Sequence, residues 1–187
     1  PEELKKESDA LFLAIGAWKD TVLHIPGENA KGVFAGSEIL KEVAMGRIPQ
    51  TGQRVVIVGA GNVAIDAARS LLRLGKEVTI VYRREKRDMP ANAVEISEAE
   101  EERIKFRFLA APHEIVTGSA GVVRALRIEK MKPGSIDRFG RRNPVATGLF
   151  EDIPCDTLIL AIGEQVSSEE LAGRVSLTRD EIGRAHV

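Results

Sequence analysis

The stretch from Val55 to Arg84 constrains the fold of this chain more than any other. It begins with a β-branched run at 55–58, which is typical of a strand buried on both faces. A glycine-rich turn follows, and then a segment with apolar residues at helical spacing that stops at Gly75. A second strand is expected over residues 77–82. A strand, a tight turn, a helix and a second strand in this order predict one unit of a parallel sheet.

The glycine-rich turn at 59–64 reads GAGNVA, the dinucleotide-binding fingerprint with alanine in the place of its third glycine. Gly59 permits the tight turn between strand and helix, and Gly61 leaves room for a pyrophosphate to approach the backbone. Ala64 is small enough for the helix to lie close to the sheet. The alternative is a turn of the same shape that binds nothing. The position of the glycines between a strand and a helix favours binding.

Arginines follow the second strand, where NAD-binding proteins usually carry an acidic residue for the ribose hydroxyls. Tyr82-Arg83-Arg84 stands there instead. A carboxylate would repel a 2′-phosphate, whereas a guanidinium binds it with forked, charge-assisted hydrogen bonds. A solvated basic loop is the alternative, because Lys86 and Arg87 continue the run. The position favours the phosphate, so the two arginines predict NADPH as the nucleotide.

The composition is that of an ordinary globular protein, with 187 residues of which 43% are hydrophobic and 29% charged. The length suits one domain, or one domain and a fragment of another. The net charge of −1 gives no reason to expect nucleic acid or a membrane as partner. No apolar run approaches the roughly 20 residues of a membrane span. One cysteine excludes an internal disulfide and a cysteine-rich cluster site, so a cytoplasmic location is expected. The start PEELKKES and the abrupt end predict a piece of a longer protein.

Beyond the arginines, the periodicity predicts a helix over 92–103, with Val94, Ile96 and Ala99 on its apolar side, and a third parallel strand over 105–109. Alternating strands are then expected at 113–117, 122–131 and near 145–150, with a basic loop at 132–143, before a last buried strand at 157–162. This antiparallel insert takes the place of a crossover helix. We therefore expect an α/β, Rossmann-like FAD/NAD(P)-binding fold, a parallel sheet with helices on one side and an antiparallel β-meander on the other.

Two segments of the chain are near-copies, LFLAIGA at 11–17 and LILAIGE at 158–164, and each is typical of a buried strand that ends in glycine. No fixed period separates further copies, so they predict two crossings between domains and not a repeat array. After the first copy, a short strand over 32–36 is expected to lead into a helix that is N-capped by Ser37 and runs through Ala44.

Four motifs together resemble the NADPH-binding domain of the glutamate synthase small-subunit (beta chain) family of FAD/NAD(P)-dependent oxidoreductases. They are GAGNVAIDAAR, VYRREKRDMPA, CDTLILAIG and the segment FLAIG…IPGE…GVFAGSEIL, and the likeness covers about residues 8–165. The resemblance implies a pyridine nucleotide-disulphide oxidoreductase-like flavoprotein in which an NADPH domain is inserted into an FAD domain. The implied reaction is hydride transfer from NADPH to FAD, with electrons passing on to iron–sulfur clusters.

The resemblance also implies roles for individual residues. Carried over by position, the pyrophosphate would lie on Gly59, Gly61, Asn62, Val63 and Ala64, the 2′-phosphate on Arg83 and Arg84, and the nicotinamide side along Ala161, Ile162 and Gly163. Asp66 and Arg69 match the motif without an evident role, and we expect a structural ion pair there. No catalytic side chain and no metal ligand is assigned.

The chain also departs from the family. It carries no FAD fingerprint, no amino-terminal iron–sulfur domain and no closing FAD segment, and GVFAG at 32–36 is not interpreted as a flavin site. We accordingly expect residues 1–52 to be an FAD-domain strand and linker, 53–165 the NAD(P)-binding domain, and 166–187 the start of the return into the FAD domain. The expected partners are a nicotinamide dinucleotide, the missing FAD and iron–sulfur domains and a large catalytic subunit. The fragment alone is expected to hold no FAD and to be inactive.

Other functions were weighed against this one. His24, His113 and His186 lack ligand spacing, Cys155 precedes a buried strand and suits packing, and the basic residues of 130–142 suit a solvated hairpin loop. A non-catalytic nucleotide-binding Rossmann module remains the alternative function. A Rossmann enzyme of another type, such as a stand-alone dehydrogenase, is less well supported because no proton-donor pair is evident.

Overall fold

The computed structural model describes residues 9, 16–17, 19–165, 178–179 and 185–186. The chain divides into two units, one of residues 20–163 and one of residues 1–19 and 164–187. The smaller unit contains β10 (Glu164–Gln165) and an antiparallel pair, β11 (Thr178–Arg179) and β12 (Ala185–His186); β1 (Lys19–Asp20) lies at the border of the units. The strand expected near 11–15 falls outside the described residues. The following paragraphs concern the larger unit.

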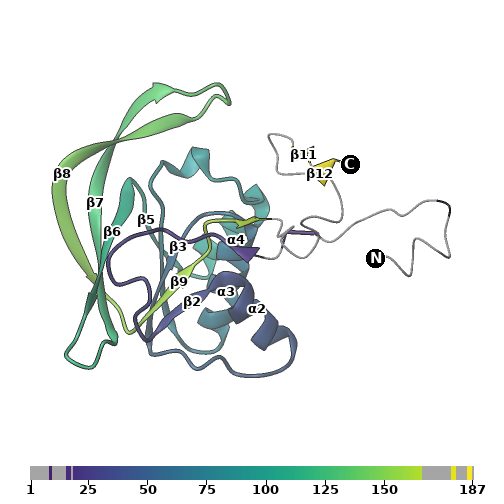
Figure 1. The fold of residues 1–187 in the computed structure, drawn as a ribbon, viewed down its shortest axis with the longest axis vertical. Coiled ribbons are helices and arrows are strands. Elements are labelled where there is room, and N and C mark those ends of the chain that lie inside the picture. The colour runs from purple at the N-terminus through teal and green to yellow at the C-terminus, as the bar shows by residue number, and fades with distance from the viewer. Residues whose placement is uncertain (1–8, 10–15, 18, 166–177, 180–184, 187) are drawn as a thin grey trace. The chain divides into compact units, whose positions relative to one another are not determined.

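A five-stranded parallel sheet lies at the centre of this unit (Figure 1). Its strands, in spatial order, are β2 (Val33–Ala35), β9 (Thr157–Leu160), β3 (Arg54–Val58), β4 (Glu77–Val81) and β5 (Lys105–Arg107). The apolar runs of the sequence form these strands because both faces of the sheet are covered. In β3, Val55 and Ile57 belong to one hydrophobic cluster, whereas Val56 and Val58 belong to the other. The predicted parallel strands are therefore confirmed, with ends that differ by a few residues.

Helices cover one face of the sheet (Figure 1). They are α2 (Gly36–Ala44), α3 (Asn62–Arg73) and α4 (Ala93–Glu101), with a short 3₁₀ turn, η1 (Lys86–Asp88). Ala64, Ala67 and Ala68 of α3 are fully buried, so the absence of bulky side chains lets this helix lie close to the strands. Gly75 has φ +80° just after α3, as expected for a glycine that ends a helix.

Two details of the helices differ from the sequence prediction. Ser37 does not cap α2; Ala35 is the N-cap residue, and the Ser37 hydroxyl donates to both carboxylate oxygens of Asp20 at 2.7 and 2.9 Å. Val94, predicted on the apolar side of α4, is 63% exposed; only Ile96 and Ala99 of this helix are buried. The start of α4 is instead set by Asn92, whose side chain accepts a hydrogen bond from the Val94 N–H at 2.9 Å.

An antiparallel sheet covers the other face (Figure 1). It consists of β6 (Ala110–Thr117), β7 (Val123–Ile136) and β8 (Arg142–Pro154) in this order. The predicted meander is confirmed, but the loop predicted at 132–143 is wrong, since β7 and β8 continue through most of it. β6 pairs with β7 only as far as Lys130, so the remainder is a two-stranded ribbon. Both of its strands are edges, where Pro133 and Pro144 are tolerated.

Cys155 lies at the turn between β8 and β9 and is fully buried in the cluster under the antiparallel sheet. Burial raises the pKa of its thiol to about 11, so the residue stays protonated near neutral pH. The predicted packing role is confirmed.

Among the residues that the structure describes, no helix has the length and apolar character needed to cross a membrane.

The ion pair expected between Asp66 and Arg69 is wrong, because Arg69 pairs with other residues. Arg69 projects from α3 toward α4, where it pairs with Glu98 at 2.6 Å and with Glu102 at 2.8 Å, whereas Asp66 is exposed. Arg73 also pairs with Glu102, at 2.7 Å. Hydrogen bonds from these two arginines hold the pKa of Glu102 at about 2, below its usual 4.5. The contact joins two helices that the sequence alone does not place side by side.

This shift predicts how stability depends on pH. The folded-state pKa of Glu102 lies below its unfolded value, so its contribution is complete above pH 4.5 and is lost as pH falls toward 2. We expect the Glu102→Gln variant to have a lower Tm than the wild type at pH 7, with the difference shrinking as pH falls. Thermal unfolding followed by circular dichroism checks this, with Glu101→Gln as control. A difference in Tm that stays constant from pH 7 to pH 2.5 contradicts the role of this carboxylate.

Candidate functional site

The fingerprint turn lies at the carboxyl edge of the parallel sheet, between the end of β3 and the start of α3. The Gly59 N–H donates to the Val81 carbonyl at 3.0 Å, and the Ala161 N–H donates to the Val58 carbonyl at 2.8 Å. Gly59 has φ +128°, and a Cβ on it would lie 2.1 Å from the Ala161 oxygen. Only glycine fits here, because the ends of β4 and β9 both approach this turn.

The second glycine of the fingerprint has a different environment. Gly61 is the N-cap residue of α3 with φ −85° and ψ 178°, its position makes no side-chain cap, and a Cβ on it would meet nothing within 4 Å among the described residues. The N–H groups of Ala64 and Ile65 donate to the Gly61 carbonyl at 3.0 and 3.2 Å, whereas those of Asn62 and Val63 bond to none of the described residues. A helix N-terminus of this kind attracts anions through its unpaired N–H groups and its dipole. Asn62 is exposed, Val63 is half-buried and Ala64 is buried in the turn that follows.

The arginine-bearing segment after β4 returns to this turn. The Asn92 N–H donates to the side-chain oxygen of Asn62 at 3.0 Å, and the Ala91 N–H donates to the Ala60 carbonyl at 3.3 Å. Residues 83–92 are thus fixed beside the fingerprint at both ends, because β4 itself pairs with β3. The structure brings together the two motifs that the sequence analysis singled out separately.

Arg83 and Arg84, which are equivalent in the sequence, differ in the structure. Arg83 is exposed, whereas Arg84 is 8% exposed and its Nη1 lies 3.3 Å from Oδ2 of Asp137. The pKa of Asp137 is held below its usual range, first by the hydrogen bond from the Arg141 N–H, so the carboxylate is charged opposite Arg84. Sequence reasoning missed Asp137, because it lies 53 residues from Arg84 in a stretch interpreted as a solvated loop.

The segment after β9 reaches the same edge. Ala161 packs against the helix-side cluster and Ile162 against the cluster of the antiparallel sheet. Gly163 has φ +115°, and a Cβ on it would meet nothing within 4 Å among the described residues. A Cβ on Gly36 would lie 2.8 Å from Cγ1 of Val63 and 3.1 Å from Cβ of Ala161, so the start of α2 also lies here. The predicted site residues near 59–64 and 161–163 are therefore neighbours in space.

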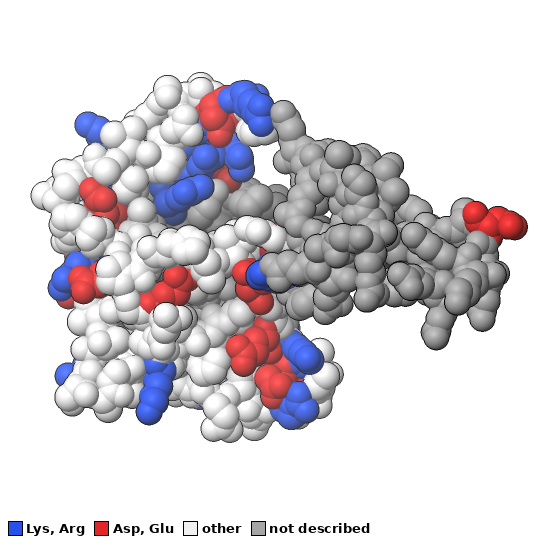
Figure 2. Space-filling model, viewed as in Figure 1, with Lys and Arg blue, Asp and Glu red and all other residues white. Residues whose placement is uncertain are grey.

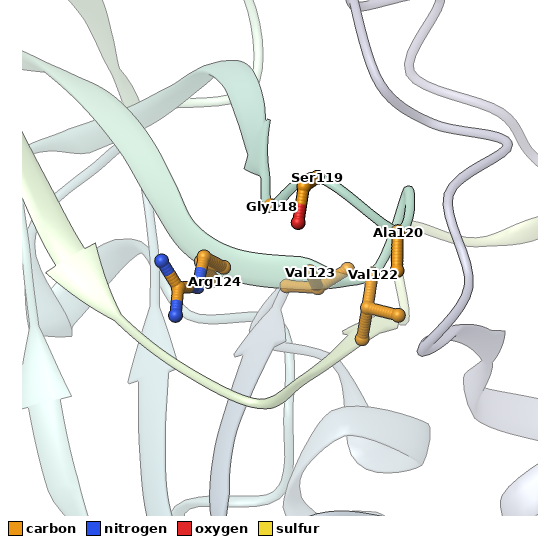
Figure 3. A pocket seen from close by; sticks show the side chains of 6 residues that line it. All are labelled: Gly118, Ser119, Ala120, Val122, Val123 and Arg124. Carbon is orange, nitrogen blue, oxygen red and sulfur yellow. The ribbon is translucent and has the colours of Figure 1, made fainter.

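Other candidates do not form a site. In the described part of the chain, no group of three or more His, Cys, Asp or Glu side chains is arranged to hold a metal ion. A pocket lies at the turn joining β6 to β7, and Figure 3 shows its six lining residues, from Gly118 to Arg124. Just before β2, the Lys31 N–H donates to the Gly121 carbonyl and the Val123 N–H donates to the Lys31 carbonyl. The pocket therefore lies at the amino edge of the sheet, whereas open α/β sheets bind ligands at the carboxyl edge.

Comparison with known sequences gives a family and several relatives. Residues 2–187 match the family of pyridine nucleotide-disulphide oxidoreductases. The beta subunit of NADP(+)-dependent formate dehydrogenase from Moorella thermoacetica is 36% identical over an alignment of 181 positions that covers 94% of this chain and 26% of the relative. The glutamate synthase (NADPH) small chain of Escherichia coli (strain K12) is 30% identical over an alignment of 196 positions that covers 98% of this chain and 42% of the relative. The chain thus spans less than half the length of these relatives, and the predicted resemblance is confirmed.

Solved structures show the same fold. Mycobacterium tuberculosis FprA in complex with NADPH aligns with a TM-score of 0.73 at 22% identity, over 89% of this chain and 52% of that chain. Thioredoxin reductase from T. acidophilum aligns with a TM-score of 0.66 at 20% identity, over 89% of this chain and 48% of that one. The predicted α/β fold class, with its parallel sheet and antiparallel meander, is confirmed.

Proposed function

We propose that this chain, which belongs to the pyridine nucleotide-disulphide oxidoreductase family, is the NADPH-binding domain of a flavin-dependent oxidoreductase. The observation that carries the proposal is the joining of the fingerprint turn to the arginine segment through the Asn92–Asn62 hydrogen bond. An anion-attracting helix N-terminus and an exposed arginine thereby lie on one edge of the sheet, as the pyrophosphate and the 2′-phosphate of one dinucleotide require. The names of the relatives support the choice of nucleotide, since they include NADPH-Fe(3+) oxidoreductase subunit beta and the glutamate synthase (NADPH) small chain.

The residues at this edge suit the cofactor. None of the described residues lies within 4 Å of a Cβ on Gly61 or Gly163, which leaves the room that a dinucleotide lying on the backbone needs. We assign the pyrophosphate to Gly59, Gly61, Asn62, Val63 and Ala64, the 2′-phosphate to Arg83 and Arg84, and the nicotinamide side to Ala161, Ile162 and Gly163. When bound, NADPH supplies a hydride for FAD. The chain's own residues bind and orient it.

The proposal extends to the domains of the longer protein. We propose residues 53–165 as the NAD(P)-binding domain, 1–52 as a strand and linker of an FAD domain, and 166–187 as the start of the return into it. FAD and iron–sulfur clusters would lie in the other domains, with a large catalytic subunit as partner and the cytoplasm as location. The isolated chain would then bind NADPH without oxidoreductase activity. The small share of each relative that the chain covers, 26% and 42%, supports further domains.

Titration of the purified chain with each nucleotide tests the proposed function. By isothermal calorimetry at low salt, we expect NADPH to bind at least tenfold more tightly than NADH, because each charged hydrogen bond to the 2′-phosphate contributes about 1.5–3 kcal/mol. The difference should shrink as salt rises, since exposed charges are screened. Equal affinity for the two nucleotides, or no binding of either, would show that the proposed function is wrong.

A further inference from the structure

The tip of the β7–β8 hairpin, residues 137–142, contacts the arginine-bearing segment after β4. Asp88 in η1 is 6% exposed, and its two carboxylate oxygens accept hydrogen bonds from the Arg142 N–H at 3.4 Å and the Glu85 N–H at 3.3 Å. The Tyr82 hydroxyl donates to the Asp88 carbonyl at 2.7 Å. Backbone from the antiparallel sheet is therefore held against the segment to which we assign the 2′-phosphate.

Asp137 brings two arginines to one point. Its Oδ2 is flanked by Nη1 of Arg84 at 3.3 Å and by Nε of Arg141 at 3.7 Å. Its Oδ1 accepts hydrogen bonds from the N–H groups of Phe139 at 2.9 Å and Arg141 at 3.0 Å, which fix the carboxylate in the turn. One carboxylate between two guanidinium groups leaves a net positive charge beside the segment. Figure 2 shows basic side chains gathered where the hairpin tip meets η1, with acidic ones between them.

The guanidinium of Arg141 has N–H donors that bond to none of the described residues. Its side chain is 42% exposed, and its guanidinium lies 5.5 Å from the centre of the Phe139 ring. Its Nε is buried and makes no hydrogen bond within the described part of the chain, because 3.7 Å to Asp137 is too long for one. A guanidinium has five N–H donors in a planar fork, a shape that matches a phosphate. The group is held in place by charge and by the ring, and its two terminal nitrogens make no hydrogen bond to a described residue.

We propose that Arg141 is a third arginine of the 2′-phosphate site, contributed by the β7–β8 hairpin, and that Asp137 is the positioning residue that sets it beside Arg84. This inference rests on the proposed function. A 2′-phosphate carries nearly two negative charges at neutral pH. Arg83 alone would neutralise only one of them, and the charge of Arg84 is shared with Asp137.

The surroundings of Tyr82 support the placement of the three arginines. Burial raises the pKa of the Tyr82 hydroxyl and the charge of Asp88 adds to that rise, whereas the positive charges of Arg84, Arg141 and Arg83 act against it. All three guanidinium groups therefore lie close enough to one side chain to affect its titration. Arg141 is the member of the set that comes from a different sheet.

The test compares Arg141→Gln with a matched control, Arg127→Gln. Arg127 is on the same hairpin, its side chain is 38% exposed, and its ion pairs are with Glu114 and Asp152. By calorimetry at low salt we expect Arg141→Gln to bind NADPH about five- to tenfold more weakly with NADH binding unchanged. Adenosine 2′,5′-bisphosphate, which has the 2′-phosphate without nicotinamide, should lose affinity by the same factor, whereas AMP should not. Arg127→Gln should match the wild type with every ligand.

Two outcomes overturn the inference. If Arg141→Gln keeps the wild-type preference for NADPH, or loses affinity for NADPH and NADH alike, Arg141 does not bind the phosphate, while a wild-type preference leaves the proposed function intact. If the wild type binds both nucleotides equally, the proposed function and this inference fail together. Arg141→Lys covers the case in which the glutamine variant does not fold. It keeps the charge but not the fork, and should retain part of the preference.

Discussion

Replacing Arg83 by alanine is expected to weaken NADPH binding roughly ten- to hundredfold and to leave NADH binding unchanged. The side chain is exposed, so its removal would take away the proposed charge-assisted hydrogen bond to the 2′-phosphate, worth about 1.5–3 kcal/mol. The proposed pyrophosphate site at 59–64 is not altered by this change. Titration of both nucleotides by calorimetry measures the effect, with Arg87→Ala as control, because Arg87 is an exposed residue of the same segment that pairs with Glu85.

Arg84→Ala should behave differently from Arg83→Ala. Arg84 is buried and Asp137 loses one of its partners, so we expect a lower free energy of unfolding as well as weaker NADPH binding. The double variant should lose most of the preference for NADPH. If Arg83→Ala binds NADPH like the wild type, or the double variant loses NADH and NADPH alike, the arginines do not bind the 2′-phosphate.

Alanine at position 59 is expected to destabilise the protein, whereas alanine at position 61 is not. The methyl group at position 59 would lie 2.1 Å from the Ala161 oxygen on a backbone with φ +128°. Strain and overpacking together should lower the free energy of unfolding by about 2–5 kcal/mol. At position 61 φ is −85° and the space beside the Cβ is open, so stability should stay close to that of the wild type.

Nucleotide binding is the property that alanine at position 61 should affect. A methyl group at position 61 fills the room into which the pyrophosphate must come, so Gly61→Ala should lose NADPH and NADH together, by about tenfold or more. Urea unfolding measures stability and calorimetry measures binding on the same samples. A stable Gly59→Ala variant would contradict the packing at this turn. A Gly61→Ala variant that binds both nucleotides normally would show that the pyrophosphate lies elsewhere.

The sequence by itself determined the parallel sheet, the fingerprint turn and the family. Long apolar runs such as 55–58 and 157–160 can be buried only in a sheet covered on both faces, and the change to alternation after 110 predicts the meander. These signals are local, because they depend on residue types at short spacing along one element. At 132–143 the residue types allow either a loop or the end of a hairpin, and the predicted loop was wrong.

Only the tertiary structure decided which charged side chains meet. Arg83 and Arg84 are identical in type and adjacent in sequence, yet one is exposed and the other pairs with Asp137 from a different sheet. Likewise Arg69 pairs with Glu98 of α4 and with Glu102 at the end of that helix, and Ser37 donates to Asp20 and does not cap its own helix. An ion pair depends on the distance between two elements after packing, which no short-range pattern encodes. The sequence therefore predicts where a nucleotide binds, and the packing of the hairpin against the arginine segment determines which side chains lie there.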